Sequence, residues 1–208
     1  MLLARIPRLL SSIFTSFTWE LPSDTKEVYL TFDDGPTLEV TEWVLNELDK
    51  YKAKATFFCL GNNASALPDV YSSILERGHA VGNHSFSHLK GFRTSVKGYV
   101  ANVLKASEII DSELFRPPYG RLRRMQTVLL RNRFKIVMWT VLSVDYNARL
   151  SGEQVVKNVI EHVNSGSIIV FHDSRKAEKN LRYALPKVLE YLSEHAYVMK
   201  KIDADSIP

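Results

Sequence analysis

Cysteine and long hydrophobic runs are scarce in this sequence of 208 residues. Cys59 is the single cysteine, which excludes an intramolecular disulfide and a cysteine-based zinc cluster. It lies in the apolar run 55–60, so we expect a small buried residue. No stretch approaches the roughly 20 apolar residues of a membrane-spanning helix, and no low-complexity tract or linker divides the chain. These absences predict one folded domain without a transmembrane segment.

The first 26 residues have the outline of a targeting segment but not its details. Basic residues precede the apolar pair Leu9 and Leu10, yet serine and threonine interrupt residues 11–18 and no small-residue cleavage site follows. We therefore expect residues 1–26 to form an N-terminal capping segment that covers one end of a domain in residues 27–208. Without a convincing signal peptide, the cytoplasm is the default location and the cell envelope is the alternative.

Positive charge is concentrated in one part of the chain. The formal net charge is +4, and six cations crowd residues 121–135: Arg121, Arg123, Arg124, Arg131, Arg133 and Lys135. A solvated helix face explains such a run more simply than a nucleic-acid or polyanion site. We therefore expect no nucleic-acid partner. The oligomeric state leaves no signal in the sequence.

Apolar runs of strand length alternate with stretches of helical period. Strand composition marks residues 28–32, 55–60, 79–82, 114–116, 136–139, 167–171 and 197–199. Helical spacing marks residues 39–51, 67–77, 95–111, 125–130, 153–163 and 181–192. The alternation predicts an α/β domain with a parallel sheet and about seven βα repeats. We expect a barrel rather than an open, doubly wound sheet, because polar motifs follow nearly every strand instead of one switch point.

Five short polar motifs follow predicted strands. They are Thr-Phe-Asp-Asp-Gly-Pro at 31–36, His-Ser-Phe-Ser-His at 84–88, Arg-Pro-Pro-Tyr-Gly at 116–120, Asp-Tyr at 145–146 and His-Asp at 172–173. The strand-end loops of an α/β barrel open on one face, so these side chains can meet there. Together the motifs indicate a metal-dependent hydrolytic site.

The first two motifs offer ligands for a divalent metal. Of the adjacent carboxylates Asp33 and Asp34, one can bind a cation while the other acts as a general base. His84 and His88 are four residues apart, a spacing that places two imidazoles on one side of a helical turn. With Asp34 they form a His₂Asp set, for which Zn²⁺ is the first choice and Co²⁺, Ni²⁺ and Fe²⁺ are alternatives. A surface turn and two hydrogen-bonded histidines are the structural alternatives.

The Arg-Pro-Pro-Tyr-Gly motif predicts a rigid loop. Two prolines stiffen the chain after Arg116, whose guanidinium can orient a carboxylate. The backbone N–H groups of Tyr119 and Gly120 are expected to stay free for an oxyanion. A plain proline-rich connection is the alternative.

His172 follows the most apolar strand and can donate a proton to a leaving amine. Asp145 can raise the pKa of His172 by its charge. A hydrogen-bonded packing histidine is the alternative. Three further histidines, His79, His162 and His195, have no comparable partners, and we expect them to be structural or exposed.

With these motifs in this order, residues 27–199 resemble the polysaccharide deacetylases of carbohydrate esterase family 4, the NodB homology domain. The matching motifs are those at 31–36, 84–88 and 116–120, and Val-Phe-His-Asp at 170–173. The resemblance implies a distorted (β/α) barrel with about seven parallel strands. It also implies removal of acetyl groups from N-acetylglucosamine polymers such as chitin or peptidoglycan, or from O-acetylated xylan. Residues 27–208 would then be the catalytic domain.

The resemblance also implies a role for each motif residue. The catalytic groups would be Asp33 as base, Arg116 as its tether, His172 as acid, Asp145 as the group that tunes this acid and the Tyr119 backbone N–H in the oxyanion hole. The divalent metal would be held by the His₂Asp set named above. The partner would be an acetylated carbohydrate.

The fourth motif departs from the family, in which Asp-x-x-Asp-Trp is usual. Leu142 and Tyr146 stand here at the first Asp and at the Trp, while Asp145 is kept. The departure changes the groove wall and so affects substrate identity more than chemistry. We expect substrate contacts from Tyr119, Tyr146 and Val170, the last lining the acetyl pocket.

Two other functions stay open at the level of sequence. Hydrolysis of a small amide or imide is suggested by the missing export signal and predicts a closed pocket. A non-catalytic sugar-binding member of the fold is suggested by the altered fourth motif.

Overall fold

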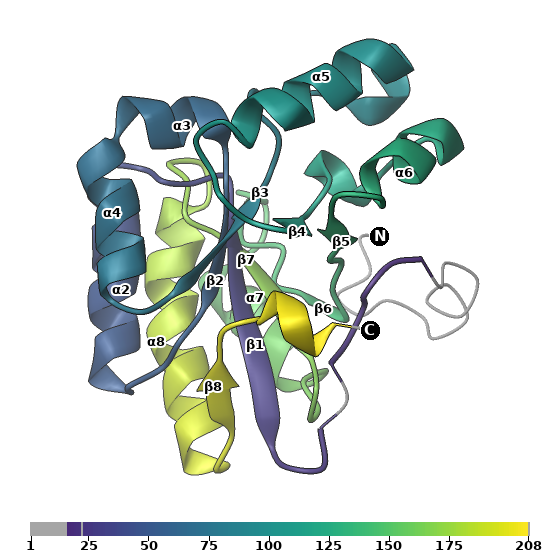
Figure 1. Cartoon of the computed structure of the whole chain (residues 1–208). Coiled ribbons are helices and arrows are strands. Elements are labelled where there is room, and N and C mark those ends of the chain that lie inside the picture. Colours follow the sequence, from purple (N-terminus) through teal and green to yellow (C-terminus); the bar gives the residue numbers. More distant parts are fainter. Residues whose placement is uncertain (1–15, 22, 208) are drawn as a thin grey trace.

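One curved parallel sheet carries strand ends toward a common edge (Figure 1). The computed structural model describes residues 16–21 and 23–207. Over these residues the strand order is β5-β4-β3-β2-β1-β7-β6, and β8 pairs with the first half of β1. All strand pairs are parallel. Because β5 and β6 are the ends of this path, the sheet is a distorted, partly open barrel, as predicted.

The elements follow the predicted alternation. The strands are β1 (Glu27–Asp33), β2 (Thr56–Cys59), β3 (Ala80–Asn83), β4 (Leu114–Phe115), β5 (Lys135–Ile136), β6 (Val141–Leu142), β7 (Ile168–His172) and β8 (Val198–Lys200). The helices are α2 (Val40–Lys50), α3 (Gly61–Ala66), α4 (Pro68–Glu76), α5 (Val96–Ala106), α6 (Arg124–Leu130), α7 (Gly152–Ile160) and α8 (Glu178–Glu194). Short 3₁₀ turns are η1 (Gly91–Arg93), η2 (Pro118–Gly120) and η3 (Ala204–Ser206).

The side chains of strand β1 alternate between the two faces of the sheet, as the two-residue period of a strand requires. Val28, Leu30 and Phe32 pack in the core beneath the helices. Tyr29 packs on the other face, inside the barrel, with residues that include Phe58. By the same period Thr31 and Asp33 face the barrel interior, so the strand delivers Asp33 to the site.

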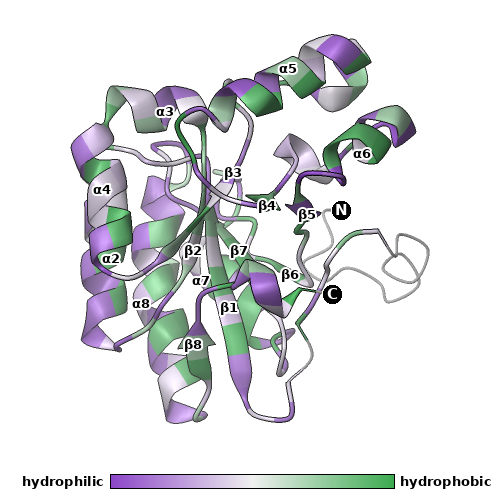
Figure 2. Cartoon of the chain, in the orientation of Figure 1, coloured by the Kyte–Doolittle hydropathy of each residue, from purple (hydrophilic) through white to green (hydrophobic). Residues whose placement is uncertain are grey.

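Helices α2, α4 and α8 lie side by side along one face of the sheet (Figure 1). Their sequences alternate between hydrophobic and hydrophilic residues (Figure 2), and the apolar positions join the main core. Cys59 is fully buried there, which confirms its predicted place. Among the described residues, no helix is long and apolar enough to cross a membrane.

Several predicted elements are shorter than expected, and hydrogen bonds explain two of these cases. The helix expected over 95–111 ends at Ala106, where Ser107 N–H reaches both Val103 O and Leu104 O in a tightened last turn. The strand expected over 136–139 ends at Ile136. Beyond it, Met138 N–H turns to Thr18 O at 2.7 Å, so the chain leaves β4 to pair with the N-terminal segment. Helix α3 and strand β6 were not predicted.

Residues 18–21 lie between the end of β5 and the start of β7. Thr18 N–H donates to Ile136 O at 2.8 Å, and Leu21 N–H donates to Gly166 O at 3.0 Å. These bonds place the segment on the open side of the barrel. Residues 1–15 and 22 lie outside the described residues, so a capping segment over 1–26 stays a prediction.

Candidate active site

One pocket of about 220 Å³ at the carboxyl ends of the strands gathers the motif residues. Of the ten residues expected at the site, eight line it: Asp33, Asp34, His84, His88, Tyr119, Tyr146, Val170 and His172. The other two, Arg116 and Asp145, are fully buried and contact Asp33 and His172. The structure therefore brings all ten together.

Asp34, His84 and His88 face one another with the geometry of a metal site. Asp34 Oδ1 lies 3.1 Å from His88 Nε2 and 3.6 Å from His84 Nε2, and the ligand atoms of all three lie within 4.8 Å of one another. The same Oδ1 is buried and accepts no hydrogen bond from the described residues. A buried acceptor facing two imidazole nitrogens fits a divalent cation.

Hydrogen bonding sets the tautomer of His84. Its Nδ1 lies 2.8 Å from Arg116 O, and because a carbonyl can only accept, Nδ1 carries the proton. The Nε2 lone pair is then free to bind a metal, as such outer contacts commonly arrange. Burial lowers the pKa of His84 to about 4, which keeps the imidazole neutral. For Asp34, burial acts to raise the pKa, but the neighbouring imidazoles hold it below its ordinary value.

The two histidines do not share a helical turn, so that part of the sequence interpretation is wrong. Residues 84–88 form a loop in which Ser85 has φ 68° and His88 has φ 55°. Asn83 Oδ1 accepts from Ser85 N–H at 2.7 Å, and Ser85 Oγ accepts from His88 N–H at 3.1 Å. These local side-chain bonds compete with helix formation and fold the loop so that both rings meet.

Arg116 is a buried anchor for Asp33. Its Nη1 donates to Asp33 Oδ1 and to Thr31 Oγ1, both at 2.7 Å. Its Nε and Nη2 donate to Val137 O and Met138 O at 3.2 and 2.9 Å. The guanidinium is thus held from several directions, and Asp33 has one fixed orientation in the pocket wall.

Asp145 holds His172 through two bonds. Asp145 Oδ1 lies 2.8 Å from His172 Nδ1, and Asp145 Oδ2 accepts from the His172 backbone N–H at 2.8 Å. Burial acts to lower the pKa of His172, but the charge and hydrogen bond of Asp145 outweigh it and raise the pKa to about 9. Since Nδ1 is bound to Asp145, Nε2 is the nitrogen left for the pocket.

The loop after Arg116 turns through Tyr119, which has φ 61°. Gly120 N–H donates to Pro117 O at 2.9 Å, so the expectation that this N–H stays free is wrong. A Cβ on Gly120 would lie 2.4 Å from Trp139, so only glycine fits. The Tyr119 ring stands edge-on to His88, 4.7 Å between centroids.

Several loops of the site hold residues in the left-handed region. In the described chain, five non-glycine residues with positive φ belong to these loops: Asp34, Ser85, His88, Tyr119 and Val144. Each costs about 1–3 kcal/mol, and such residues cluster where function fixes the backbone. Val144 has φ 62°, which is especially unfavourable for a β-branched residue, and it directly precedes Asp145.

The remaining wall includes residues that sequence reasoning missed. Trp139 and Lys176 line the pocket, and Leu142 lies there beside the fully buried Val170. Leu142 was singled out only as a departure from the family pattern. Trp139 ends a predicted strand, which was a usable signal, whereas nothing in the sequence marks Lys176.

The other histidines serve local structure. His79 Nδ1 accepts from Ala55 N–H at 3.1 Å, and burial lowers its pKa to about 4. His162 and His195 each contact a carbonyl four residues earlier. None of these three lines the pocket.

Comparison with known proteins decides the family. A family model described as "Polysaccharide deacetylase" matches residues 20–136, more than half of the chain. This chain belongs to the polysaccharide deacetylase family. A "Peptidoglycan-N-acetylglucosamine deacetylase" of Bacillus cereus is 34% identical over 166 residues, covering 76% of this chain and 60% of that protein. A second protein of that name from the same organism is 30% identical over 187 residues, covering 86% and 88%.

Solved structures of this deacetylase family share the fold. A crystal structure of a peptidoglycan N-acetylglucosamine deacetylase in complex with a 4-naphthalen-1-yl-N-oxidanyl-benzamide matches with a TM-score of 0.86. It is 30% identical and covers 97% of this chain and 96% of its own. The chain spans about 60% of the length of the first relative named above.

Proposed function

We propose that this chain is a metal-dependent hydrolase that removes the acetyl group from N-acetylglucosamine units of a peptidoglycan or chitin type of glycan and releases acetate. The observation that carries the proposal is the meeting, in one pocket, of a tethered carboxylate, a carboxylate-bound histidine and a His₂Asp set. The first relatives named above are deacetylases of peptidoglycan, which supports the same substrate class here.

The metal we propose is Zn²⁺, held by Asp34, His84 and His88, because two imidazoles and a carboxylate suit it. When bound, such an ion polarises an amide carbonyl and lowers the pKa of water toward about 7. Co²⁺, Ni²⁺ and Fe²⁺ accept the same ligands and are the alternatives.

Asp33 is the proposed base. Its carboxylate lines the pocket beside Asp34, and the Arg116 bond at 2.7 Å fixes which oxygen faces Arg116. The other oxygen can take the proton of a water that attacks the acetamide carbon. The backbone N–H of Tyr119 is the proposed donor to the oxyanion that this attack creates.

His172 is the proposed acid. With a pKa of about 9, its imidazole is protonated at neutral pH. It can pass the Nε2 proton to the amine nitrogen as the C–N bond breaks, which leaves acetate and a free amino sugar. Asp145 keeps the ring in the tautomer and orientation that this transfer needs.

The acetyl methyl group has an apolar place to lie. Leu142 and Val170 pack together with Trp139 and line the same pocket as the proposed base and acid. A small apolar wall favours an acetyl group over larger acyl groups, since extra carbons must displace buried side chains.

The pocket adjoins a second cavity, which argues against the closed pocket that the small-amide alternative predicts. This cavity shares Tyr119 and Tyr146 with the pocket, so a chain of sugars can continue past the reacting unit. A peptidoglycan substrate would also place the reaction at the cell envelope rather than in the cytoplasm.

Acetate release from three substrates tests the proposal. Protein loaded with Zn²⁺ is offered N-acetylglucosamine tetramer, purified peptidoglycan and a set of small cyclic amides. We expect acetate from one or both glycans and no product from the amides. Product from the amides alone would favour the alternative hydrolase, and glycan binding without acetate would favour a non-catalytic role.

A further inference from the structure

A second cavity of about 440 Å³ continues from the catalytic pocket. Tyr119 and Tyr146 line both cavities and therefore stand at their boundary. The outer cavity lies between the η1 turn and the η2 loop. A substrate unit next to the one in the catalytic pocket would lie in it.

The outer cavity is basic. Lys90, Arg93 and Arg121 line it, and no acidic residue does. All three side chains are exposed, and none forms an ion pair with a described residue. Lys90 Nζ lies 5.4 Å from the Tyr119 ring centre, beside the boundary.

The chain segment that supplies most of this cavity's lining differs in net charge from the rest of the chain. Residues 85–135 hold eleven Lys and Arg against three Asp and Glu, whereas the rest holds sixteen against twenty. Unpaired cations in a concave surface raise the local concentration of anions. The cluster that the sequence suggested was a solvated helix face thus extends, through Arg121, to the edge of the catalytic pocket.

The cavity wall is held in place by polar bonds. Gln126 Nε2 donates to Gly91 O at 3.0 Å, and Arg123 donates to Phe92 O. These bonds tie the η1 turn to the start of α6. The Phe92 ring, 56% exposed, adds an apolar surface to the same cavity. A fixed wall with cations and an exposed ring suits a sugar that carries an anionic substituent.

We propose that this cavity binds a carboxylate borne by the sugar next to the unit that is deacetylated, with Arg93 and Arg121 as the main contacts. Guanidinium groups bind carboxylates through paired hydrogen bonds, which makes arginine suited to this task. The inference rests on the proposed function and makes it narrower, since a neutral chitin chain carries no such group. The carboxylate comes from a lactyl ether on the sugar or from a peptide attached to it.

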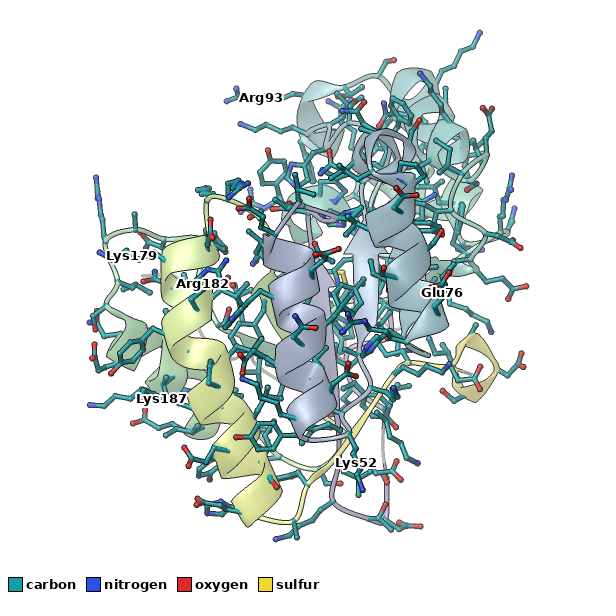
Figure 3. The ribbon with its side chains drawn as sticks, turned by 90° about the vertical axis from the view of Figure 1, so that its left-hand side faces the viewer. Lys52, Glu76, Arg93, Lys179, Arg182 and Lys187 are labelled. Atoms are coloured by element: carbon teal, nitrogen blue, oxygen red, sulfur yellow. The ribbon has the colours of Figure 1, made fainter. Side chains whose placement is uncertain are left out.

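Binding and turnover are measured with matched oligosaccharides of equal length. One carries lactyl carboxylates, the second carries the same groups as methyl esters, and the third carries a short peptide on each lactyl group. The variants are Arg93→Gln/Arg121→Gln and, as a control with the same loss of charge, Lys52→Gln/Lys187→Gln. Figure 3 shows Arg93 at the top of the molecule and both control residues in its lower half.

We expect the wild-type protein to bind the carboxylate form at least about fivefold more tightly than the ester, as two exposed charge contacts allow. The Arg93→Gln/Arg121→Gln protein should lose this preference in both Kd and KM, and the control protein should keep it. Of the lactyl and peptide forms, the one that binds more tightly identifies the source of the carboxylate.

Equal affinity for acid and ester in the wild-type protein would overturn the proposal. Binding of polyglutamate as tight as that of the carboxylate glycan would also overturn it, in favour of a general polyanion surface. The measurement of binding affinity does not depend on turnover. Its result therefore distinguishes a failure of this inference from a failure of the proposed function. If acetate release fails while the carboxylate preference is present, the proposed chemistry is wrong and the binding site stands.

Discussion

The catalytic pocket and the outer basic cavity are adjacent, but they differ in whether their charged side chains are paired. At the pocket, Asp33 is paired with the buried Arg116 behind it, and the His172 ring is paired with the buried Asp145. In the outer cavity, three exposed cations have no acidic partner among the described residues. Pairing fixes the orientation of groups that act on a bond, whereas unpaired exposed charge is suited to a partner that arrives from solution.

Removal of a metal ligand should have the largest effect. His84→Ala deletes an imidazole whose Nδ1 is fixed by Arg116 O. We expect most of the metal to be lost and acetate release to fall by about a thousandfold or more, since the metal supplies the polarising charge. Metal content and acetate release are measured together.

His79→Ala is the matched control for this change, because His79 is also buried but lies outside the pocket. It should keep its metal. Loss of metal from both variants would mean that the change reflects general unfolding rather than the site.

The contrast between buried and exposed pairs can be measured as stability. Arg116→Met leaves Asp33 buried without its partner, which should cost about 3–5 kcal/mol in the free energy of unfolding. Arg175→Met breaks an exposed pair with Glu39 and should cost less than about 1 kcal/mol. Urea unfolding followed by circular dichroism gives both values. Similar losses in the two variants would contradict the account of Arg116 as a buried anchor.

The tuning of His172 predicts a pH effect. As the acid, His172 must be protonated, so kcat/KM should fall as the pH rises through its pKa of about 9. Asp145→Asn removes the charge that raises this pKa and leaves the burial that lowers it. The alkaline limb should then move to lower pH, and activity at pH 8 should drop by about tenfold or more. An unchanged alkaline limb would assign the acid to another group.

A change in salt concentration should have the smallest effect of these tests. It should act on the exposed charges of the outer cavity and not on the buried pairs at the catalytic pocket. Raising NaCl from about 0.05 M to about 0.5 M screens exposed charges far more than buried ones. We expect KM for a carboxylate-bearing oligosaccharide to rise a few-fold while kcat changes little. An equal response with the methyl ester would show that salt acts elsewhere.

Most of the fold could be predicted from the sequence because each repeat buries an apolar strand beneath an amphipathic helix. Strand β1 and helix α2 differ from their predicted ranges by about one residue at each end, as expected for such patterns. Strand β6 was missed because its two residues lie between irregular segments. The shortened β5 follows from pairing with Thr18, a distant contact that local pattern does not reveal.

The parts of the site whose chemistry lies in short motifs could be predicted from the sequence. The parts that depend on backbone conformation could not. His84 and His88 were recognised, but the loop that joins their rings depends on positive φ at Ser85 and on Asn83. The outer cavity was missed for another reason. Whether a cation such as Arg121 is paired depends on neighbours far away in sequence.

The most direct test is acetate release by Zn²⁺-loaded wild-type protein and Asp33→Asn at equal metal content, with N-acetylglucosamine tetramer and peptidoglycan as substrates. We expect acetate from the wild-type protein and a loss of about a hundredfold to ten-thousandfold in the variant, the range expected for a general base. Acetate release by the variant at the wild-type rate would contradict the assignment of Asp33 and the proposed chemistry of the pocket.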